Sequence, residues 1–579
     1  MYSRIFFFTI FLILLSTPSV HADANIQVEI IGIKGRLLEN VQARLRIKRF
    51  GETSALSASE IKRLHSLAEK DIRSAVAPYG YYGPEIASSL ESDEQGWYAR
   101  YEVTLGDPVM VDSVSITTEG EGREIKELSN PLRYFGIEPG DQLNHPKYER
   151  GKKALLQQAI ALGFLDAEYR VHEIAVDRVK KSAAIIVLFD TRNRYYFGET
   201  SSSQKVIKNK LLSNYLSYQP GEYYDVSKLH QVQRDLYKTN YFDNVQLTGD
   251  KTRAENFLVP INIELDPVEK FNRYSFGVGY DTDTGARAIF EWSNKLLNSR
   301  GHWMDASLIL GDLESSSTVN YNIPIRDPRY ESFHITGLSS RQRWKGTKTA
   351  KGLVGGSYEY YTERDRYSLS LELADEDYLI GSQEDRSLLL IPGISASWVF
   401  ADQVINTENG FRASVSVSGA AEEVVSDATF LKIQADARAI LSPIEKWRII
   451  GRASVGTIVV DTIDDLPPTQ RFYAGGSNSV RGYRYRTLGA KDSNGTVIGG
   501  RHLLTGSIEL ERSVSQYLRT VAFYDVGNAM DDPKVDVVQG VGVGLGVALP
   551  FGQIRVELAY PLDDEGSAQY FYLTVGADL

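Results

Sequence analysis

The stretch RFYAGGSNSVRGY, residues 471–483, is the most informative part of the sequence. Its glycines and small polar residues predict a loop. Two arginines and three aromatic residues are unusual in a loop that is fully exposed to solvent, so we expect this one to pack against another part of the chain. A buried guanidinium needs carboxylate partners, because an unpaired buried charge is costly. The stretch therefore predicts a loop that packs against another part of the chain with its charge paired.

Length and composition narrow the class of protein. The chain has 579 residues, too many for one compact domain. A net charge of -11 disfavours a nucleic-acid partner, and a charged fraction of 24% argues against a bundle of transmembrane helices. The chain has no cysteine, and its 8 histidines include no His-Glu-x-x-His motif. We therefore expect no enzyme, no catalytic or metal-binding residues and no cofactor.

Residues 1–22 predict a cleaved signal peptide. Arg4 supplies the positive charge, Ile5–Leu15 the apolar run, and Val20-His21-Ala22 the small-residue cleavage site. A membrane anchor is the alternative, but the run is far shorter than the roughly 20 residues of a spanning helix. The mature chain is then either a soluble periplasmic protein or a membrane barrel.

Residues 23–266 predict three repeats of one α+β unit. We place the units at 23–106, 107–192 and 193–266. In each unit a helical stretch ends at a glycine or asparagine that an aromatic residue follows: Gly80-Tyr81, Gly163-Phe164 and Asn240-Tyr241. A left-handed helix C-cap favours these two residue types, and recurrence at roughly 80 residues indicates an array.

Residues 267–579 predict a transmembrane β-barrel of about 16 strands, each of about 10 residues. Helical periodicity ends near Phe271, and runs of alternating apolar and polar residues follow. This alternation is expected when one face of each strand meets lipid and the other a wet lumen. A soluble β-sandwich would alternate in the same way, but it would need no signal peptide followed by a chain end that reads as a strand, and its apolar faces would be bulkier.

The motif Val480-Arg481-Gly482-Tyr483 resembles the signature of the Omp85 family of outer-membrane assembly barrels. In that family the loop that carries the motif folds into the barrel lumen. The three N-terminal units resemble POTRA domains, the periplasmic modules that precede Omp85 barrels. As partners of Arg481 we select Glu509 and Asp525, which the strand alternation places on the lumenal face. A solvated loop arginine is the alternative.

The run Gly542–Gly546 predicts room for this loop. Val543 and Leu545 would face lipid, so that Gly542, Gly544 and Gly546 leave bare backbone on the lumenal side. We therefore expect the loop to fold over these glycines.

The first and last barrel strands predict a weak seam, because glycines pin the register of a strand poorly. The Omp85 resemblance implies that this seam is a lateral gate for client strands, and an ordinary closed seam is the alternative. The predicted seam residues are Tyr274, Phe276, Gly277, Gly279, Tyr570, Tyr572, Gly576 and Leu579.

The number of POTRA-like units points to one branch of the family. Three units, with Phe472–Gly476 and the turn Gly279–Gly285, are similar to the outer-membrane subunits of translocation and assembly modules. That resemblance implies a barrel in the outer membrane that inserts unfolded outer-membrane proteins, such as autotransporters. It also implies contact with membrane lipid and with an elongated partner anchored in the inner membrane. The alternative is a two-partner-secretion-type pore for a dedicated passenger protein.

Overall fold

The computed structural model describes residues 26–53, 56–94, 96–403, 406–549, 552–563 and 569–576. The predicted signal peptide therefore lies outside the described residues. The chain divides into two compact units, which we describe separately. One contains the residues up to Thr200 with 218–229 and 249–261; the other contains 201–217, 230–248 and the chain from Asn262 onward.

The first α+β domain has a sheet of order β1-β3-β2. Helix α3 begins after Ser57, whose hydroxyl accepts a hydrogen bond from the Glu60 amide in a capping box. The helix buries Ile61 and Ile72 in one core with Tyr101 of the sheet. The elements are β1 (Ile26–Ile31), α1 (Gly35–Arg44), α2 (Arg46–Thr53), α3 (Ala58–Val76), β2 (Glu85–Asp93) and β3 (Gly96–Thr104).

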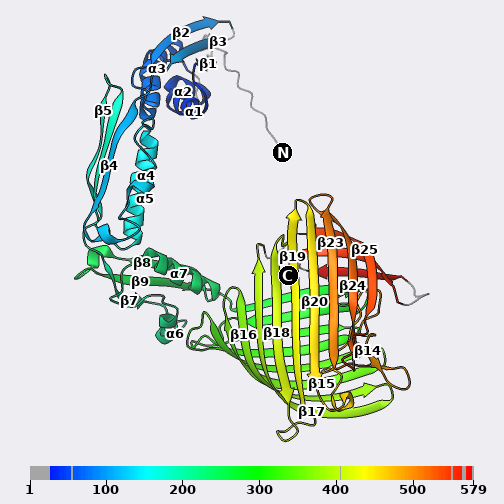
Figure 1. Cartoon of the computed structure of the whole chain (residues 1–579). Helices are drawn as coiled ribbons and strands as arrows, with labels where there is room; N and C mark the ends of the chain where they lie inside the picture. The colour runs from blue at the N-terminus through cyan, green and yellow to red at the C-terminus, as the bar shows by residue number, and fades with distance from the viewer. Residues whose placement is uncertain are drawn as a thin grey trace, which may run out of the picture. The chain divides into compact units, whose positions relative to one another are not determined.

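The next two domains repeat this plan with sheet orders β4-β6-β5 and β7-β9-β8. Figure 1 shows α5 lying along the sheet of β4 and β5. The elements of the second domain are β4 (Met110–Glu119), α4 (Leu132–Phe135), α5 (His145–Ala161), β5 (Glu168–Asp177) and β6 (Ser182–Asp190). Those of the third are β7 (Tyr196–Ser202), α6 (Asn209–Asn214), α7 (Val226–Lys238), β8 (Phe242–Gly249) and β9 (Leu258–Pro267).

The three helix-ending positions that the sequence predicts adopt left-handed backbone conformations. The φ angles are +87° at Gly80, +95° at Gly163 and +57° at Asn240. The expected conformation is confirmed at each position. None of the helices in the described ranges is both long and apolar enough to cross a membrane.

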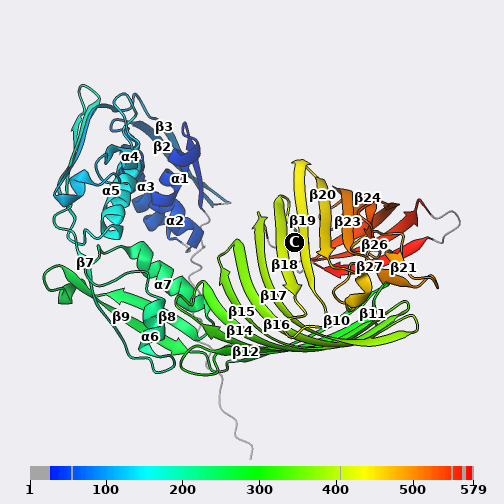
Figure 2. The same cartoon turned by 60° about the horizontal axis from the view of Figure 1, so that its bottom comes forward.

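Over the described residues, one 16-stranded sheet forms the barrel, in agreement with the predicted fold class. Each strand pairs with the next strand of this sheet along the chain, and Figures 1 and 2 show the strands side by side around one interior. The strands are β10 (Asn272–Asp281), β11 (Gly285–Asn294), β12 (Trp303–Gly311), β13 (Glu314–Pro324), β14 (Glu331–Trp344), β15 (Thr347–Tyr361), β16 (Asp365–Ile380), β17 (Gln383–Ala401), β18 (Gly410–Ala420), β19 (Phe430–Ile444), β20 (Trp447–Val459), β23 (His502–Ser513), β24 (Leu518–Met530), β25 (Val538–Leu549), β26 (Gly552–Pro561) and β27 (Tyr570–Gly576).

The sheet order begins at β10 and ends at β27, and no ladder joins the described residues of these two strands. Side chains alternate along β10 as the sequence predicts. Tyr274, Phe276 and Val278 are 69%, 74% and 78% exposed, which places them on the outer face. Such apolar outer faces suit lipid, because polar side chains there would find no hydrogen-bond partners.

Candidate functional site

Residues 471–483 lie in the connection between β20 and β23, and we name them the lumen loop. This connection also holds the short strands β21 (Ala490–Lys491) and β22 (Val497–Gly499). The Phe472 amide donates to the Gly500 carbonyl at 3.0 Å, and the Phe472 ring lies where a Cβ on Gly456 of β20 would meet it at 2.4 Å. The loop therefore returns onto the inner face of the barrel wall.

Arg481 is the centre of the loop and is 1% exposed. Its Nε and Nη2 donate to the two carboxylate oxygens of Asp525 at 2.7 and 2.8 Å, a bidentate pair. Nη2 also lies 2.8 Å from Glu509 Oε1. Both acids that the sequence selects therefore contact this guanidinium. A solvated loop arginine, the alternative, does not describe this geometry.

Glu557 of β26 is a partner that sequence reasoning missed. Arg481 Nη1 donates to both of its carboxylate oxygens at 3.1 Å. The signal was present, because Glu557 alternates with Val556 and Leu558, which are 36% and 46% exposed on the outer face. The same alternation identified Glu509 in β23.

Arg555 completes what we name the ion-pair cluster, made of Arg481, Arg555, Glu509, Asp525 and Glu557. Arg555 Nη2 lies 2.7 Å from Glu509 and 2.8 Å from Glu557. Arg452 of β20 approaches the margin of the cluster, 3.6 Å from Glu509 and 4.0 Å from Asp525. Buried charges are tolerated when they are paired, and each member of this cluster has a partner of opposite charge, although Arg555 Nε has no hydrogen-bond acceptor among the described residues.

The glycines of β25 have other neighbours than the sequence predicts. A Cβ on Gly540 would lie 2.0 Å from the Arg481 carbonyl oxygen, so the loop backbone approaches β25 most closely there. The Phe523 ring fills the space over Gly542, and the Glu557 stem fills the space over Gly544. The expectation that the loop itself covers Gly542, Gly544 and Gly546 was wrong: neighbouring side chains cover the first two, and the Arg481 guanidinium lies 3.4 Å from the Phe523 ring centroid.

The other motif residues fix the loop to the last strands. Val480 is fully buried, and Gly482 has a φ of +97°, which favours glycine. The Gly482 amide donates to the Tyr572 hydroxyl of β27 at 3.1 Å, and that hydroxyl donates to the Tyr483 carbonyl at 3.2 Å. Tyr483 donates to the Gln539 carbonyl at 3.2 Å.

The loop also reaches the first barrel strand. The Ser477 amide donates to Asp283 Oδ2 at 2.7 Å, in the turn that follows β10. The Ser477 hydroxyl donates to Asp281 at 3.4 Å. Burial raises the pKa of Asp283 to about 6. One loop therefore contacts both edges of the sheet, β10 through Asp281 and the turn after it, and β27 through Tyr572.

The predicted seam residues fall into different environments. Tyr274 and Phe276 face outward and are exposed, whereas Tyr572 is 1% exposed and binds the loop. A Cβ on Gly279 would lie 3.0 Å from the Arg287 side chain, and Gly277 has more room. Tyr570 and Gly576 pair with β26, and Leu579 lies outside the described residues. Within the described ranges, no group of three or more His, Cys, Asp or Glu is placed to hold a metal ion.

Two family models match the chain. A model described as the Omp85 superfamily domain matches residues 313–578, and a model described as the POTRA domain TamA domain 1 matches residues 27–105. The first therefore covers the lumen loop, and the second covers the first α+β domain.

Curated relatives are outer membrane protein assembly factors named BamA. The protein from Nitratidesulfovibrio vulgaris is 22% identical over 430 residues, which cover 69% of this chain and 53% of that protein. The protein from Neorickettsia risticii is 23% identical over 522 residues, covering 83% and 68%. The chain thus spans about half the length of the first relative.

Among solved structures, BamA from Haemophilus ducreyi lacking POTRA domains 1–3 is similar in fold. The TM-score is 0.71 at 15% sequence identity, and the match covers 81% of this chain and 99% of that one.

Proposed function

Because this chain belongs to the Omp85 superfamily, as an outer-membrane barrel that follows periplasmic POTRA domains, we propose that it inserts selected outer-membrane proteins as the TamA-type subunit of a translocation and assembly module. Autotransporters are among the expected clients. The match of residues 27–105 to a TamA-type POTRA domain supports the assignment to this branch.

The observation that carries the proposal is that no ladder joins the described residues of β10 and β27. A strand edge without a ladder presents backbone N–H and C=O groups to which a client strand can add. In the proposed mechanism the client pairs with this edge, and its own folding supplies the free energy. No covalent step is required, so the protein acts by templating a strand and lowering the barrier to insertion.

The lumen loop acts in this mechanism as a brace. The ion-pair cluster holds it to β23, β24 and β26, while Tyr572 and Asp283 connect it to the two edges of the seam. A brace of this kind keeps the edges in place while leaving their backbone groups open to a client.

The proposed partner is a TamB-like protein, anchored in the inner membrane and extended across the periplasm. The POTRA sheets supply suitable edges for it. The strand β2 lies at the edge of the first sheet and pairs only with β3 among the described residues. An extended partner segment can add to such an edge through its backbone.

The test is a disulfide lock across the seam, which the absence of native cysteine makes clean. One cysteine is introduced in β10 and one in β27, and insertion of an autotransporter into proteoliposomes is measured before and after reduction. The matched control joins Val278 to Ala288, which are direct partners in the β10–β11 ladder. We expect the seam lock to stop insertion reversibly and the control to insert normally.

The two-partner-secretion alternative predicts a different result. A secretion pore would conduct ions and export its passenger through the lumen, with the seam locked or free. Planar-bilayer conductance of the locked protein therefore separates the two functions. Unimpaired client insertion by the locked barrel would remove the proposed gate.

A further inference from the structure

Three arginines lie directly opposite one another on the lumenal side of adjacent strands. Arg412 of β18 pairs in register with Arg438 of β19, which pairs with Arg452 of β20. We name these residues the arginine row. Directly opposed side chains have Cβ atoms about 4.5–5.5 Å apart, and like charges at that spacing are destabilising. An anion beside the row would therefore be stabilising.

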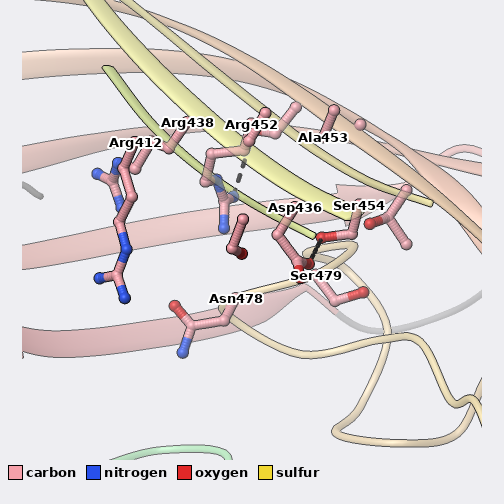
Figure 3. A pocket seen from close by; sticks show the side chains of 13 residues that line it. Arg412, Asp436, Arg438, Arg452, Ala453, Ser454, Asn478 and Ser479 are labelled. Atoms are coloured by element: carbon pink, nitrogen blue, oxygen red, sulfur yellow. Dashed lines mark hydrogen bonds between the residues drawn. The ribbon is translucent and has the colours of Figure 1, made fainter. Parts of the chain in front are cut away.

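The row lines a cavity of 140 Å³, which the lumen loop borders. Figure 3 shows the three arginines on one wall and Asn478 and Ser479 of the loop beside them. Ser414, Asp436, Ser454, Thr505 and Ser507 complete the polar lining. A cavity of this size is about ten times what one water needs, so it accommodates a small polyatomic anion.

The lining supplies little negative charge to the row. Within the described part of the chain, no carboxylate lies within 4.0 Å of the Arg412 side chain, which is exposed and borders this cavity. Arg412 also borders a second cavity, whose lining includes Asp305 and Glu359. Arg452 reaches Glu509 and Asp525 only at 3.6 and 4.0 Å, and among the described residues its Nε has no hydrogen-bond acceptor.

Asp436 is the acid in the lining, and its oxygens are already engaged. Ser454 donates to Oδ1 at 2.6 Å, and the Gln434 amide donates to Oδ1 and Oδ2 at 3.3 and 3.0 Å. The cavity lining holds three arginines and one carboxylate, so its formal charge is positive, although Glu509 and Asp525 approach Arg452 from outside the lining.

We propose that this cavity binds a phosphate group. Guanidinium forks match the oxygens of phosphate in bidentate geometry, and the hydroxyl groups of the lining can donate to the remaining oxygens. The group could be free phosphate or the phosphomonoester of a lipid, since both present the same dianion. The volume is large enough for one such group.

Phosphate in this cavity would join the loop to a second wall. The ion-pair cluster holds the loop to β23–β26, whereas the cavity brings Asn478 and Ser479 beside β18–β20. A bound dianion would bridge the loop backbone and the row, and the loop would then be fixed at both of its sides. This inference does not depend on the client or on the seam.

The experiment uses the full-length protein in phospholipid-free detergent micelles. Inorganic phosphate and, separately, a short-chain phosphatidic acid are titrated calorimetrically, with chloride at equal ionic strength as the reference. We expect saturable binding of one or both ligands, and at least a tenfold loss of affinity in the double variant Arg412→Gln and Arg438→Gln. Binding of phosphate identifies a free-anion site, and binding of the lipid alone identifies a headgroup site.

Two further proteins keep the result interpretable. Arg386→Gln, which removes an arginine paired with Asp375 outside the cavity, should bind as the parent does. Arg412→Lys retains the charge but removes the guanidinium fork. It replaces the double variant in the titration if that variant loses its heat-modifiable barrel. The proposal fails if neither ligand binds above the chloride reference, or if the Gln double variant and the parent bind equally.

Discussion

The lumenal wall carries arginines in two arrangements, which lie at the two ends of one line of paired residues that extends the arginine row. From β18 to β24 this line holds Arg412, Arg438, Arg452, Ser507 and Asp525, each opposite the next. At its acidic end, Arg481 of the loop is 1% exposed and surrounded by carboxylates. At its basic end, Arg412 faces an open cavity. Charge is thus satisfied inside the chain at one end and left for a ligand at the other.

The two ends have different consequences for stability. A buried ion pair contributes little relative to a well-packed apolar core, but removing one of its partners is strongly destabilising. An exposed arginine beside like charges is itself unfavourable, so its removal is expected to stabilise the empty barrel. Substitutions at the two ends should therefore change stability in opposite directions.

The largest effect is expected from Arg481→Glu. It places a fourth carboxylate among Glu509, Asp525 and Glu557, and should destabilise the barrel by about 3–5 kcal/mol. Heat-modifiable mobility and urea unfolding in micelles measure the loss. Reversal of a partner through Asp525→Arg should recover part of it. Arg484→Glu, an exposed change in the same connection, is the control and should leave the midpoint unchanged.

A smaller effect is expected from Gly540→Ala, because its Cβ would lie 2.0 Å from the Arg481 carbonyl oxygen. Relief of that overlap must move the loop or β25, and such overpacking costs about 1–3 kcal/mol. Gly352→Ala in β15 is the matched control, since no atom lies within 4 Å of its added Cβ. Equal unfolding midpoints for the two variants would contradict the close approach of loop and strand.

Tyr572→Phe tests the link from the loop to the last strand. It removes the acceptor of the Gly482 amide and the donor to the Tyr483 carbonyl, so a loss of about 0.5–1.5 kcal/mol is expected. Urea unfolding gives the stability, and proteolysis of the loop reports its release. Tyr570→Phe, two residues earlier on the same strand, should resist protease as the parent does.

Arg412→Gln tests the basic end of the lumenal wall. Without phosphate it should raise stability by about 0.2–1 kcal/mol, because it removes a like charge opposite Arg438. Phosphate should then stabilise the parent more than the variant. A destabilised variant in phosphate-free buffer would show that Arg412 is already compensated within the chain.

A pH-dependent effect concerns Asp283 in the turn after β10, whose pKa burial raises to about 6. Because this value exceeds the unfolded value of about 3.9, the folded state takes up the proton first as the pH falls through 6. The charged carboxylate therefore lowers stability above pH 6. Asp283→Asn should be more stable than the parent at pH 8, and unfolding at pH 5 should show a smaller difference.

Local sequence patterns were sufficient for the fold and for part of the site. Alternation in β10 separates Tyr274 and Phe276 from the lumen, and the same rule places Glu509 and Asp525 inside. It would also have identified Glu557, which lies on the same lumenal face.

The remaining contacts depend on register between strands. Arg412, Arg438 and Arg452 are unevenly spaced in sequence, and turn lengths and bulges decide that they lie opposite one another. The approach of Arg481 to Gly540 and the meeting of Ser477 with Asp283 depend on the path of an irregular loop. No local pattern specifies such a path.

The position of the lumen loop in the chain has a consequence for the order of folding. Its bonds to Asp525, Glu557 and Tyr572 span 44, 76 and 90 residues, all toward the C-terminus, whereas its bond to Asp283 spans 194. Shorter loops close at lower entropic cost. We therefore expect the C-terminal third to nucleate around Arg481, with the β10 hairpin captured last.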